Sequence, residues 1–143
     1  MNYSPLRYPG GKTKIAPMVK LLIEKSGMKN VTYVEPFAGG AGVSLELLFS
    51  GEVDHIVIND YDKAIYSIWR AIIENTNQFV DLIKNTEVSI DEWYRQKNIY
   101  TNQSNRYSVE LAFATFFLNR TNRSGILAAG PIGGYEQNGN YLI

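Results

Sequence analysis

The feature that most constrains this fold is a glycine-rich turn between two short apolar segments. Residues 31–34 have the composition of a buried strand, and residues 35–42 contain three glycines. A helix is predicted over residues 43–50, and a second strand over residues 53–59. This order of strand, turn, helix and strand predicts a parallel βαβ unit with a right-handed crossover.

Helices are predicted over much of the remaining chain. Residues 16–26 carry apolar side chains at helical spacing, and Gly27 suits the end of that helix. In the second half, Asp62, Ser89 and Ser108 have side chains that cap helix N-termini. The elements expected there are helices over residues 63–74, 78–84, 93–100 and 109–118, and a Gly- and Asn-rich loop or hairpin over residues 119–143.

Two parallel strands are too few for a complete sheet. Parallel strands are normally buried on both faces, in sheets of several strands. Residues 141–143 form an apolar stub that suits the beginning of another strand. The sequence therefore predicts a fragment of a larger α/β fold.

Composition excludes several classes of protein. The chain has no cysteine, which rules out disulfides and thiolate metal sites. It has neither a signal-peptide core nor an apolar run of about 18 residues, so we expect a soluble, cytoplasmic protein without membrane contact. His55 is the only histidine and lies in a predicted strand, so a Ser-His-Asp triad is not expected. Asp60-Tyr61-Asp62 does not predict a metal site either, because such near neighbours would not converge on one ion.

The net charge of zero conceals a segregation of charge along the chain. Residues 35–92 hold eleven acidic and three basic side chains, whereas residues 1–34 and 93–143 are both basic. Two basic segments flanking an acidic one are suited to a polyanion groove, but they are equally expected of ordinary solvated helix faces. Charge alone leaves both interpretations open.

An acidic residue ends the second predicted strand. Asp60 follows Gly42 by 18 residues, close to the position at which dinucleotide-binding folds place the acid that accepts hydrogen bonds from ribose hydroxyls. The same geometry suits any adenosine ligand at the carboxyl ends of the strands. The alternative is a tight βα turn followed by a surface aspartate.

Two common nucleotide-binding motifs do not fit the sequence. The G-x-G-x-x-G fingerprint, read from Gly40, requires a glycine where the chain has Leu45. Gly11-Lys12-Thr13 matches the end of a phosphate-binding P-loop, but Leu6 stands where its first glycine belongs. A ligand without a pyrophosphate is therefore favoured.

Four segments together resemble the Dam-type (alpha-group) family of DNA adenine-specific methyltransferases. They occur in that family's order and span most of the chain. The segments are RYPGGK at residues 7–12, YVEPFAGGAG at residues 33–42, IND at residues 58–60, and LNRT at residues 118–121 followed by Gly125. The resemblance implies an incomplete Rossmann-like S-adenosylmethionine-dependent methyltransferase fold with a helical DNA-recognition insert.

The resemblance also implies a cofactor-binding part over residues 1–62, whose ligand is S-adenosyl-L-methionine. Lys12 is then placed on the methionyl carboxylate and Asp60 on the ribose hydroxyls. Tyr8 either borders the cofactor or is a packing aromatic. The residues assigned to the cofactor are Tyr8, Lys12, Glu35, Pro36, Phe37, Ala38, Gly39, Gly40, Gly42 and Asp60.

Residues 63–143 are implied to be the helical target-recognition region with its Gly-rich hairpin, and its partner is double-stranded DNA. Amide and guanidinium groups suit base edges and phosphates. The residues assigned to DNA are Asn119, Arg120, Asn122 and Arg123. Arg120 has a structural alternative, because it closes a buried helix. The residues interpreted as phosphate contacts or plain surface are Arg95, Lys97 and Arg106.

The family's catalytic loop, Asp-Pro-Pro-Tyr, does not occur in this sequence, because no two of the five prolines are adjacent. That loop holds the target amine and stacks on the flipped-out adenine, so no catalytic residue is assigned. We expect the chain alone to be inactive, with a C-terminal half carrying that loop as its partner. Two alternatives remain: a non-enzymatic cofactor- or DNA-binding remnant, and a nucleotide-binding protein of another class that uses Gly11-Lys12-Thr13.

Overall fold

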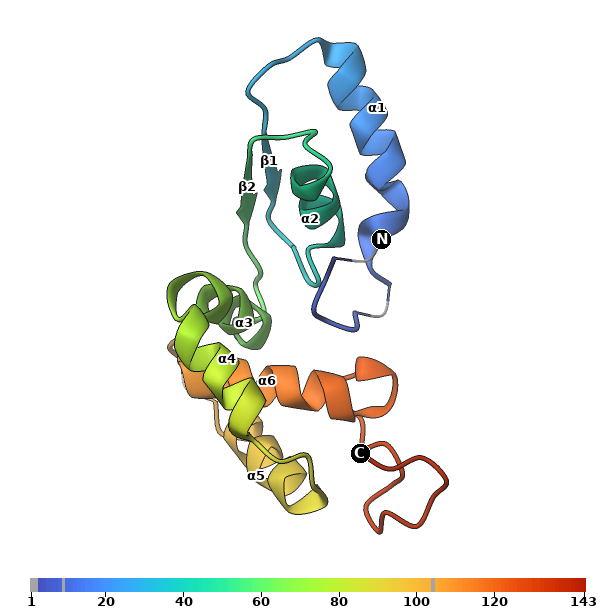
Figure 1. Ribbon diagram of the computed structural model, residues 1–143, viewed down its shortest axis with the longest axis vertical. Helices are drawn as coiled ribbons and strands as arrows, with labels where there is room; N and C mark the ends of the chain where they lie inside the picture. Colours follow the sequence, from blue (N-terminus) through green and yellow to red (C-terminus); the bar gives the residue numbers. More distant parts are fainter. Residues whose placement is uncertain (1–2, 9, 104) are drawn as a thin grey trace. The chain divides into compact units, whose positions relative to one another are not determined.

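The computed structural model describes residues 3–8, 10–103 and 105–143. Pro9 of the RYPGGK motif lies outside these residues. The chain divides into two compact units, Met1–Tyr61 (unit 1) and Asp62–Ile143 (unit 2), which are described one at a time (Figure 1). Within the described residues, no helix is long and apolar enough to span a membrane.

Unit 1 contains the parallel βαβ arrangement. The two strands pair in parallel, with Thr32 opposite His55 and Glu35 opposite Ile58. The mixed α/β class and the order strand, turn, helix, strand are thus confirmed, while the Rossmann-like detail stays a prediction. The elements of unit 1 are the short 3-10 helix η1 (Lys12–Ile15), α1 (Ala16–Ser26), β1 (Thr32–Glu35), α2 (Gly42–Phe49) and β2 (His55–Ile58).

One face of this two-stranded sheet is covered. Helices α1 and α2 lie on the same side of the strands, where Tyr33 and Ile56 pack against them (Figure 1). The buried residues of this core are Ala16, Val43, Leu47 and Val53. Because side chains alternate along a strand, Val34 and Val57 point to the opposite face and are 58% and 51% exposed.

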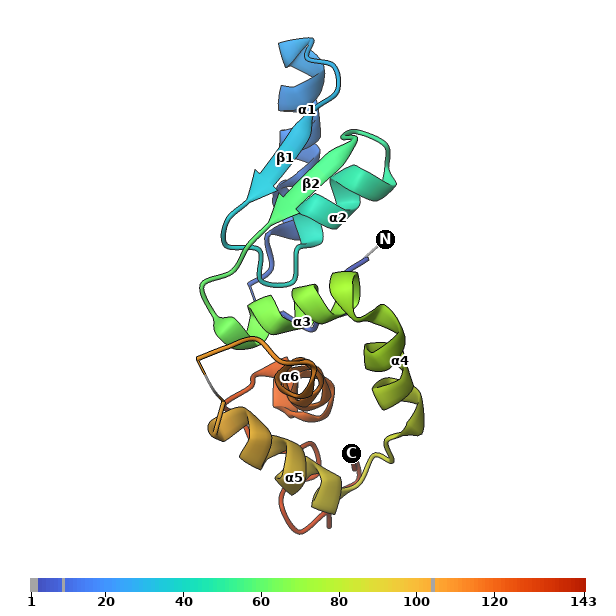
Figure 2. The ribbon, with the colours of Figure 1, turned by 90° about the vertical axis from the view of Figure 1, so that its left-hand side faces the viewer.

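Unit 2 is built around its last helix. Figure 2 shows α6 end-on, with α3, α4 and α5 around it. Helix α6 is apolar almost all round, which accounts for its burial on most sides, as predicted. The helices of unit 2 are α3 (Lys63–Glu74), α4 (Thr76–Asn85), α5 (Ile90–Thr101) and α6 (Val109–Thr121).

Side-chain caps determine where these helices begin. Asp62 and Ser108 accept hydrogen bonds from backbone N–H groups two and three residues further on, at 2.8 and 3.0 Å. Ser89 accepts one from the N–H of Glu92 at 3.2 Å. Since Ser89 is the cap, α5 begins at Ile90, earlier than the predicted residue 93.

Helix α6 extends three residues further than predicted. It ends at Thr121, so Asn119 and Arg120 belong to the helix and not to the loop that follows. The Thr121 hydroxyl donates to the carbonyl of Phe117 at 2.8 Å, and both Asn119 and Thr121 are buried. The polarity of Asn119 and Thr121 predicted a loop, but the side chains of both residues face the interior of unit 2.

A closed loop follows α6. Asn122 and Pro131 form an isolated antiparallel bridge. The N–H of Arg123 donates to the carbonyl of Gly130 at 3.1 Å, which closes residues 123–130 into what we call the recognition loop. The hairpin expected in this region is therefore a loop closed by one bridge, with no paired strands among the described residues.

Candidate functional site

The carboxyl ends of β1 and β2 are joined by hydrogen bonds. The backbone N–H of Asn59 donates to the carbonyl of Glu35 at 3.0 Å, and its side-chain amide donates to the carbonyl of Pro36 at 3.2 Å. These bonds hold the end of β2 beside the beginning of the glycine turn. There the carboxylate of Asp60 accepts a hydrogen bond from the N–H of Gly39 at 2.7 Å. The acid and the turn therefore form one local structure.

Glu35, the last residue of β1, is a buried carboxylate that is 3% exposed. Its Oε2 accepts hydrogen bonds from the backbone N–H and the hydroxyl of Ser44 in α2. Its Oε1 lies 3.1 Å from the Nζ of Lys12, which also donates to the carbonyl of Phe37. Lys12 thus compensates a buried charge and links the N-terminal segment to the turn.

Two glycines allow the N-terminal segment to lie directly on the turn. A Cβ on Gly39 would stand 2.8 Å from the ring of Tyr8, and one on Gly42 would stand 2.1 Å from the hydroxyl of Thr13. Gly39 also has a φ of +51°, in the left-handed region that favours glycine. A side chain at either position would displace the side chain of Tyr8 or Thr13 from the turn.

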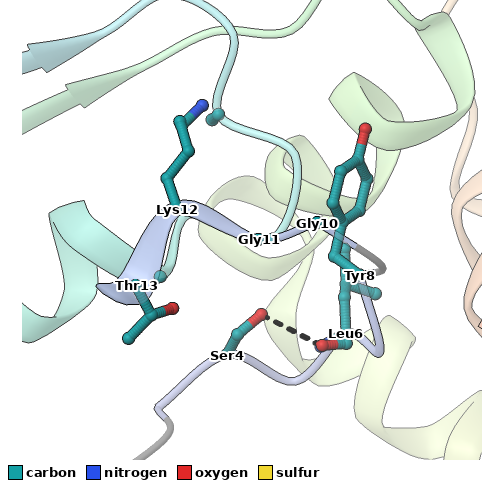
Figure 3. Close-up of a pocket in the computed structure, with 10 residues that line it drawn as sticks. Ser4, Leu6, Tyr8, Gly10, Gly11, Lys12 and Thr13 are labelled. Atoms are coloured by element: carbon teal, nitrogen blue, oxygen red, sulfur yellow. Dashed lines mark hydrogen bonds between the residues drawn. The ribbon is translucent and has the colours of Figure 1, made fainter. Parts of the chain in front are cut away.

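A small pocket lies between the N-terminal segment and the turn (Figure 3). It encloses about 80 Å³, well below the roughly 300–1,000 Å³ of typical small-molecule sites. The residues assigned to the cofactor that line it are Tyr8, Lys12, Ala38, Gly40 and Gly42. The assigned residues outside its lining are Glu35, Pro36, Phe37, Gly39 and Asp60.

In unit 2, the two asparagines assigned to DNA are buried. Asn119 and Asn122 are 2% and 0% exposed. The amide of Asn119 donates to the carbonyl of Gly125 at 2.9 Å, and that of Asn122 donates to the carbonyls of Ile126 and Leu127 at 2.9 and 3.1 Å. Their polar groups stabilise the recognition loop and do not face solvent, which places them away from any base edge in this conformation.

The two arginines assigned to DNA are exposed. No ion pair joins Arg120 or Arg123 to a carboxylate in the part of the chain that the structure describes. A Cβ on Gly130 would lie 3.3 Å from a guanidinium nitrogen of Arg123 and 3.1 Å from the hydroxyl of Tyr135. Gly130 therefore leaves room for both side chains over the loop.

Sequence analysis gave no role to Trp93 and interpreted Lys97 as a phosphate contact or plain surface, and the structure shows a hydrogen bond of each that the sequence did not predict. The indole N–H of Trp93 donates to the side-chain carbonyl of Asn122 at 2.7 Å, and Lys97 Nζ donates to the carbonyl of Leu127 at 2.9 Å. Their spacing of four residues on one helix was the only available signal, because it places them on the same face. Arg95, by contrast, is exposed and pairs with Glu92 at 3.2 Å.

The environment of Lys97 is aromatic. Its Nζ lies 5.9 and 5.5 Å from the ring centres of Trp93 and Tyr100. Burial, and secondly the negative charge of Asp62, raises the pKa of Tyr100. The phenol is therefore un-ionised at neutral pH, and Lys97 meets a neutral ring face.

A parallel βαβ unit with a glycine turn after its first strand and an acid after its second is the arrangement in which α/β proteins bind nucleotide-like ligands. Comparison with known proteins makes the class specific. The family model described as D12 class N6 adenine-specific DNA methyltransferase matches residues 8–141. This chain belongs to that family.

A curated relative agrees with this assignment. The type II methyltransferase M.MjaIII of Methanocaldococcus jannaschii is 23% identical over an alignment of 143 positions. The alignment covers 92% of this chain and 50% of the relative. The chain thus spans about half the length of that relative.

Proposed function

We propose that this chain supplies the cofactor-binding and target-recognition parts of an S-adenosylmethionine-dependent methyltransferase that modifies the exocyclic amine of adenine in double-stranded DNA. Membership of the D12 class family supports the reaction and the DNA substrate. The observation that most directly supports cofactor binding is the hydrogen bond from the N–H of Gly39 to the carboxylate of Asp60, which joins the glycine turn to the acid after β2.

The residues around the turn have the chemistry that S-adenosylmethionine requires. The cofactor supplies an electrophilic methyl group when bound. Asp60 accepts hydrogen bonds from the ribose hydroxyls, and the glycine turn allows close approach of the backbone. Lys12 binds the methionyl carboxylate. In the structure this lysine is already held at the turn by Glu35 and the carbonyl of Phe37.

We infer that the N-terminal segment moves when the cofactor binds. The pocket of about 80 Å³ is too small for a ligand of this size. The ring of Tyr8 lies over Gly39 and fills part of the space above the turn. We infer that the segment containing Tyr8 and Lys12 shifts when the cofactor binds and then borders it.

DNA contacts are proposed for the exposed arginines alone. Arg120 at the end of α6 and Arg123 at the beginning of the recognition loop are suited to phosphates or base edges. Asn119 and Asn122 are reassigned from base contacts to the support of this loop, because their amides are buried and hydrogen-bonded to its carbonyls.

Methyl transfer needs a part that this sequence lacks. No Asp-Pro-Pro-Tyr loop occurs among the 143 residues, so nothing in them holds the target amine and stacks on the flipped-out adenine. We propose that a C-terminal half with that loop completes the enzyme, and that the chain alone binds its ligands without turnover.

Equilibrium dialysis with methyl-labelled S-adenosylmethionine tests this proposal. The chain should retain the label in the presence of excess ATP and should transfer none of it to DNA. Lys12→Ala should weaken retention, whereas the matched removal of a neighbouring exposed lysine, Lys14→Ala, should not. Methylation of DNA by the chain alone would refute the missing-part argument, and displacement of the label by ATP would favour a nucleotide-binding protein.

A further inference from the structure

The inner part of the recognition loop is supported by side chains. The carbonyls of Gly125, Ile126 and Leu127, three consecutive residues, all accept hydrogen bonds from side chains that lie outside residues 123–130. Backbone hydrogen bonds close its base, from Arg123 to Gly130, and form two turns inside it, from Ile126 to Arg123 and from Ala129 to Ile126. Among the described residues, three consecutive carbonyls are nevertheless bonded only by side chains from elsewhere in unit 2 or by Ala129, so these side chains contribute to the shape of the loop.

One face of α5 supports the loop twice, directly through Lys97 and indirectly through Trp93, which holds Asn122. Trp93 and Lys97 are one helical turn apart. Trp93 donates its indole N–H to the side-chain carbonyl of Asn122, which fixes the amide so that its NH₂ group meets Ile126 and Leu127. Trp93 is itself 2% exposed, so this arrangement is shielded from water.

The ammonium of Lys97 is directed to the loop and not to solvent. It donates to the carbonyl of Leu127 at 2.9 Å and lies near the faces of Trp93 and Tyr100. A carbonyl dipole and two aromatic faces together stabilise a cation at this place. A lysine so engaged is poorly placed to contact a phosphate.

We propose that Trp93 and Lys97 are positioning residues for DNA recognition, which hold the recognition loop in its DNA-binding conformation before DNA arrives. The proposal rests on the proposed function, in which Arg123 of this loop contacts DNA. It assigns to α5 a role in recognition without any contact with the nucleic acid, and it replaces the interpretation of Lys97 as a phosphate contact.

The expected effect follows from the fraction of molecules in the binding conformation. The apparent dissociation constant equals the intrinsic constant divided by that fraction. If loss of the Lys97 ammonium leaves about a tenth of the molecules with an ordered loop, the dissociation constant for DNA rises about tenfold. The number of phosphates contacted does not change, so the dependence of binding on salt stays the same.

Loop order is measured first, by hydrogen exchange of the backbone amides in the 143-residue chain. Lys97→Met keeps an unbranched side chain of similar length and removes the ammonium. It should accelerate exchange in residues 123–130 while the amides of α6 stay protected. Lys97→Arg retains a cationic donor and should restore protection. Arg95→Met is the matched control, because it removes an exposed charge from the same helix without touching the loop.

DNA binding is then measured by fluorescence anisotropy with a random-sequence duplex over a series of salt concentrations, at temperatures where every variant is folded. Lys97→Met should bind about tenfold more weakly than the original chain, with an unchanged slope of log affinity against log salt. Lys97→Arg should recover most of the affinity. Trp93→Phe, which removes only the N–H donor and part of the ring, should show the same pattern as Lys97→Met.

Three results would overturn the proposal. A salt slope reduced by about one in Lys97→Met, with unchanged loop exchange, would make Lys97 a phosphate contact. Equal affinity despite a disordered loop would show that loop order does not govern recognition. A chain with a protected loop that binds no DNA even at low salt would refute the DNA-binding part of the proposed function, and the positioning role with it.

Discussion

The two units bury their apolar side chains in different ways. Unit 2 encloses α6, ten of whose residues are buried. Unit 1 covers only one face of its sheet, so Val34 and Val57 remain exposed on the other, as do Met18 and Leu22 on α1. The comparison shows that the most enclosed core and the glycine turn, to which we assign the cofactor, belong to different units. We expect unit 2 to provide most of the stability and unit 1 to hold the cofactor chemistry.

This contrast can be measured separately in each unit. Both tryptophans, Trp69 and Trp93, belong to unit 2, so tryptophan fluorescence follows the unfolding of that unit. Hydrogen exchange of the strand amides in β1 and β2 follows unit 1. Together the two probes report the stability of each unit separately.

The largest effect is expected in the core of unit 2. Leu118 is 0% exposed in α6, and Leu118→Ala should lower the free energy of unfolding by about 3 kcal/mol, from lost burial and the cavity that remains. Val57→Ala on the open face of the sheet should cost no more than about 0.5 kcal/mol. Urea denaturation followed by tryptophan fluorescence measures the first cost, and hydrogen exchange in β1 and β2 at increasing urea concentration measures the second. Similar costs at the two positions would contradict the contrast between the units.

The next effect concerns the polar support of the recognition loop. Trp93→Phe leaves the buried side-chain carbonyl of Asn122 without its donor, which should cost about 2 kcal/mol in unfolding free energy. Tyr94→Phe removes a hydroxyl from the neighbouring, half-exposed ring and should change the unfolding free energy little. Tryptophan fluorescence measures both, from Trp69 alone in Trp93→Phe and from Trp69 and Trp93 together in Tyr94→Phe. Equal losses would mean that the indole N–H has no special role.

In unit 1, a substitution at the glycine turn is expected to lower the free energy of unfolding. Gly39 and Gly51 both have positive φ, but only a Cβ on Gly39 would meet another group, the ring of Tyr8. Gly51→Ala should therefore cost only the left-handed strain, about 1 kcal/mol, whereas Gly39→Ala should cost more and should also displace Tyr8. Hydrogen exchange in β1 and β2 reports the stability of unit 1. Equal costs would show that Tyr8 does not rest on the turn.

The smallest effect is expected at alkaline pH. Burial raises the pKa of Tyr100 and Tyr107 in unit 2, and burial together with the charge of Glu35 raises that of Tyr33 in unit 1. An unfolded phenol therefore ionises first, at a pH of about 10. Stability should be complete below that pH and fall as the pH rises through it towards the folded values.

Urea denaturation of the original chain and of Tyr100→Phe at several pH values measures this loss. The variant should lose less stability than the original chain above a pH of about 10. An identical decline in both proteins would assign the alkaline loss to other groups.

Local signals predicted much of the fold. The helices over residues 16–26 and 63–74 have the boundaries that were predicted, because Gly27 ends the first and Asp62 caps the second. The glycine turn and both strands were also predictable, since small residues between two apolar runs have few other arrangements. Each of these signals lies within a few residues of the structure that it determines.

The support of the recognition loop could not be predicted in this way. Asn122 is a polar residue in a polar segment, and only the tertiary structure shows that it is buried and bonded to Trp93, 29 residues earlier in the chain. Lys97 was interpreted as a phosphate contact or plain surface for the same reason. A sequence displays which groups can form hydrogen bonds, but their partners depend on long-range packing.

The central claim is that the turn and Asp60 form the binding site of S-adenosylmethionine. The most direct test is the melting temperature of the chain with and without this ligand and its demethylated product. At about 100 times its dissociation constant the ligand contributes roughly 2.7 kcal/mol, which should raise the melting temperature by about 5–10 °C.

Asp60→Ala should abolish that shift. Asp54→Ala, which removes an exposed carboxylate just before β2, should preserve it. A cooperatively folded chain whose melting temperature does not respond to the ligand, or responds equally in Asp60→Ala, would contradict the assignment of the cofactor site.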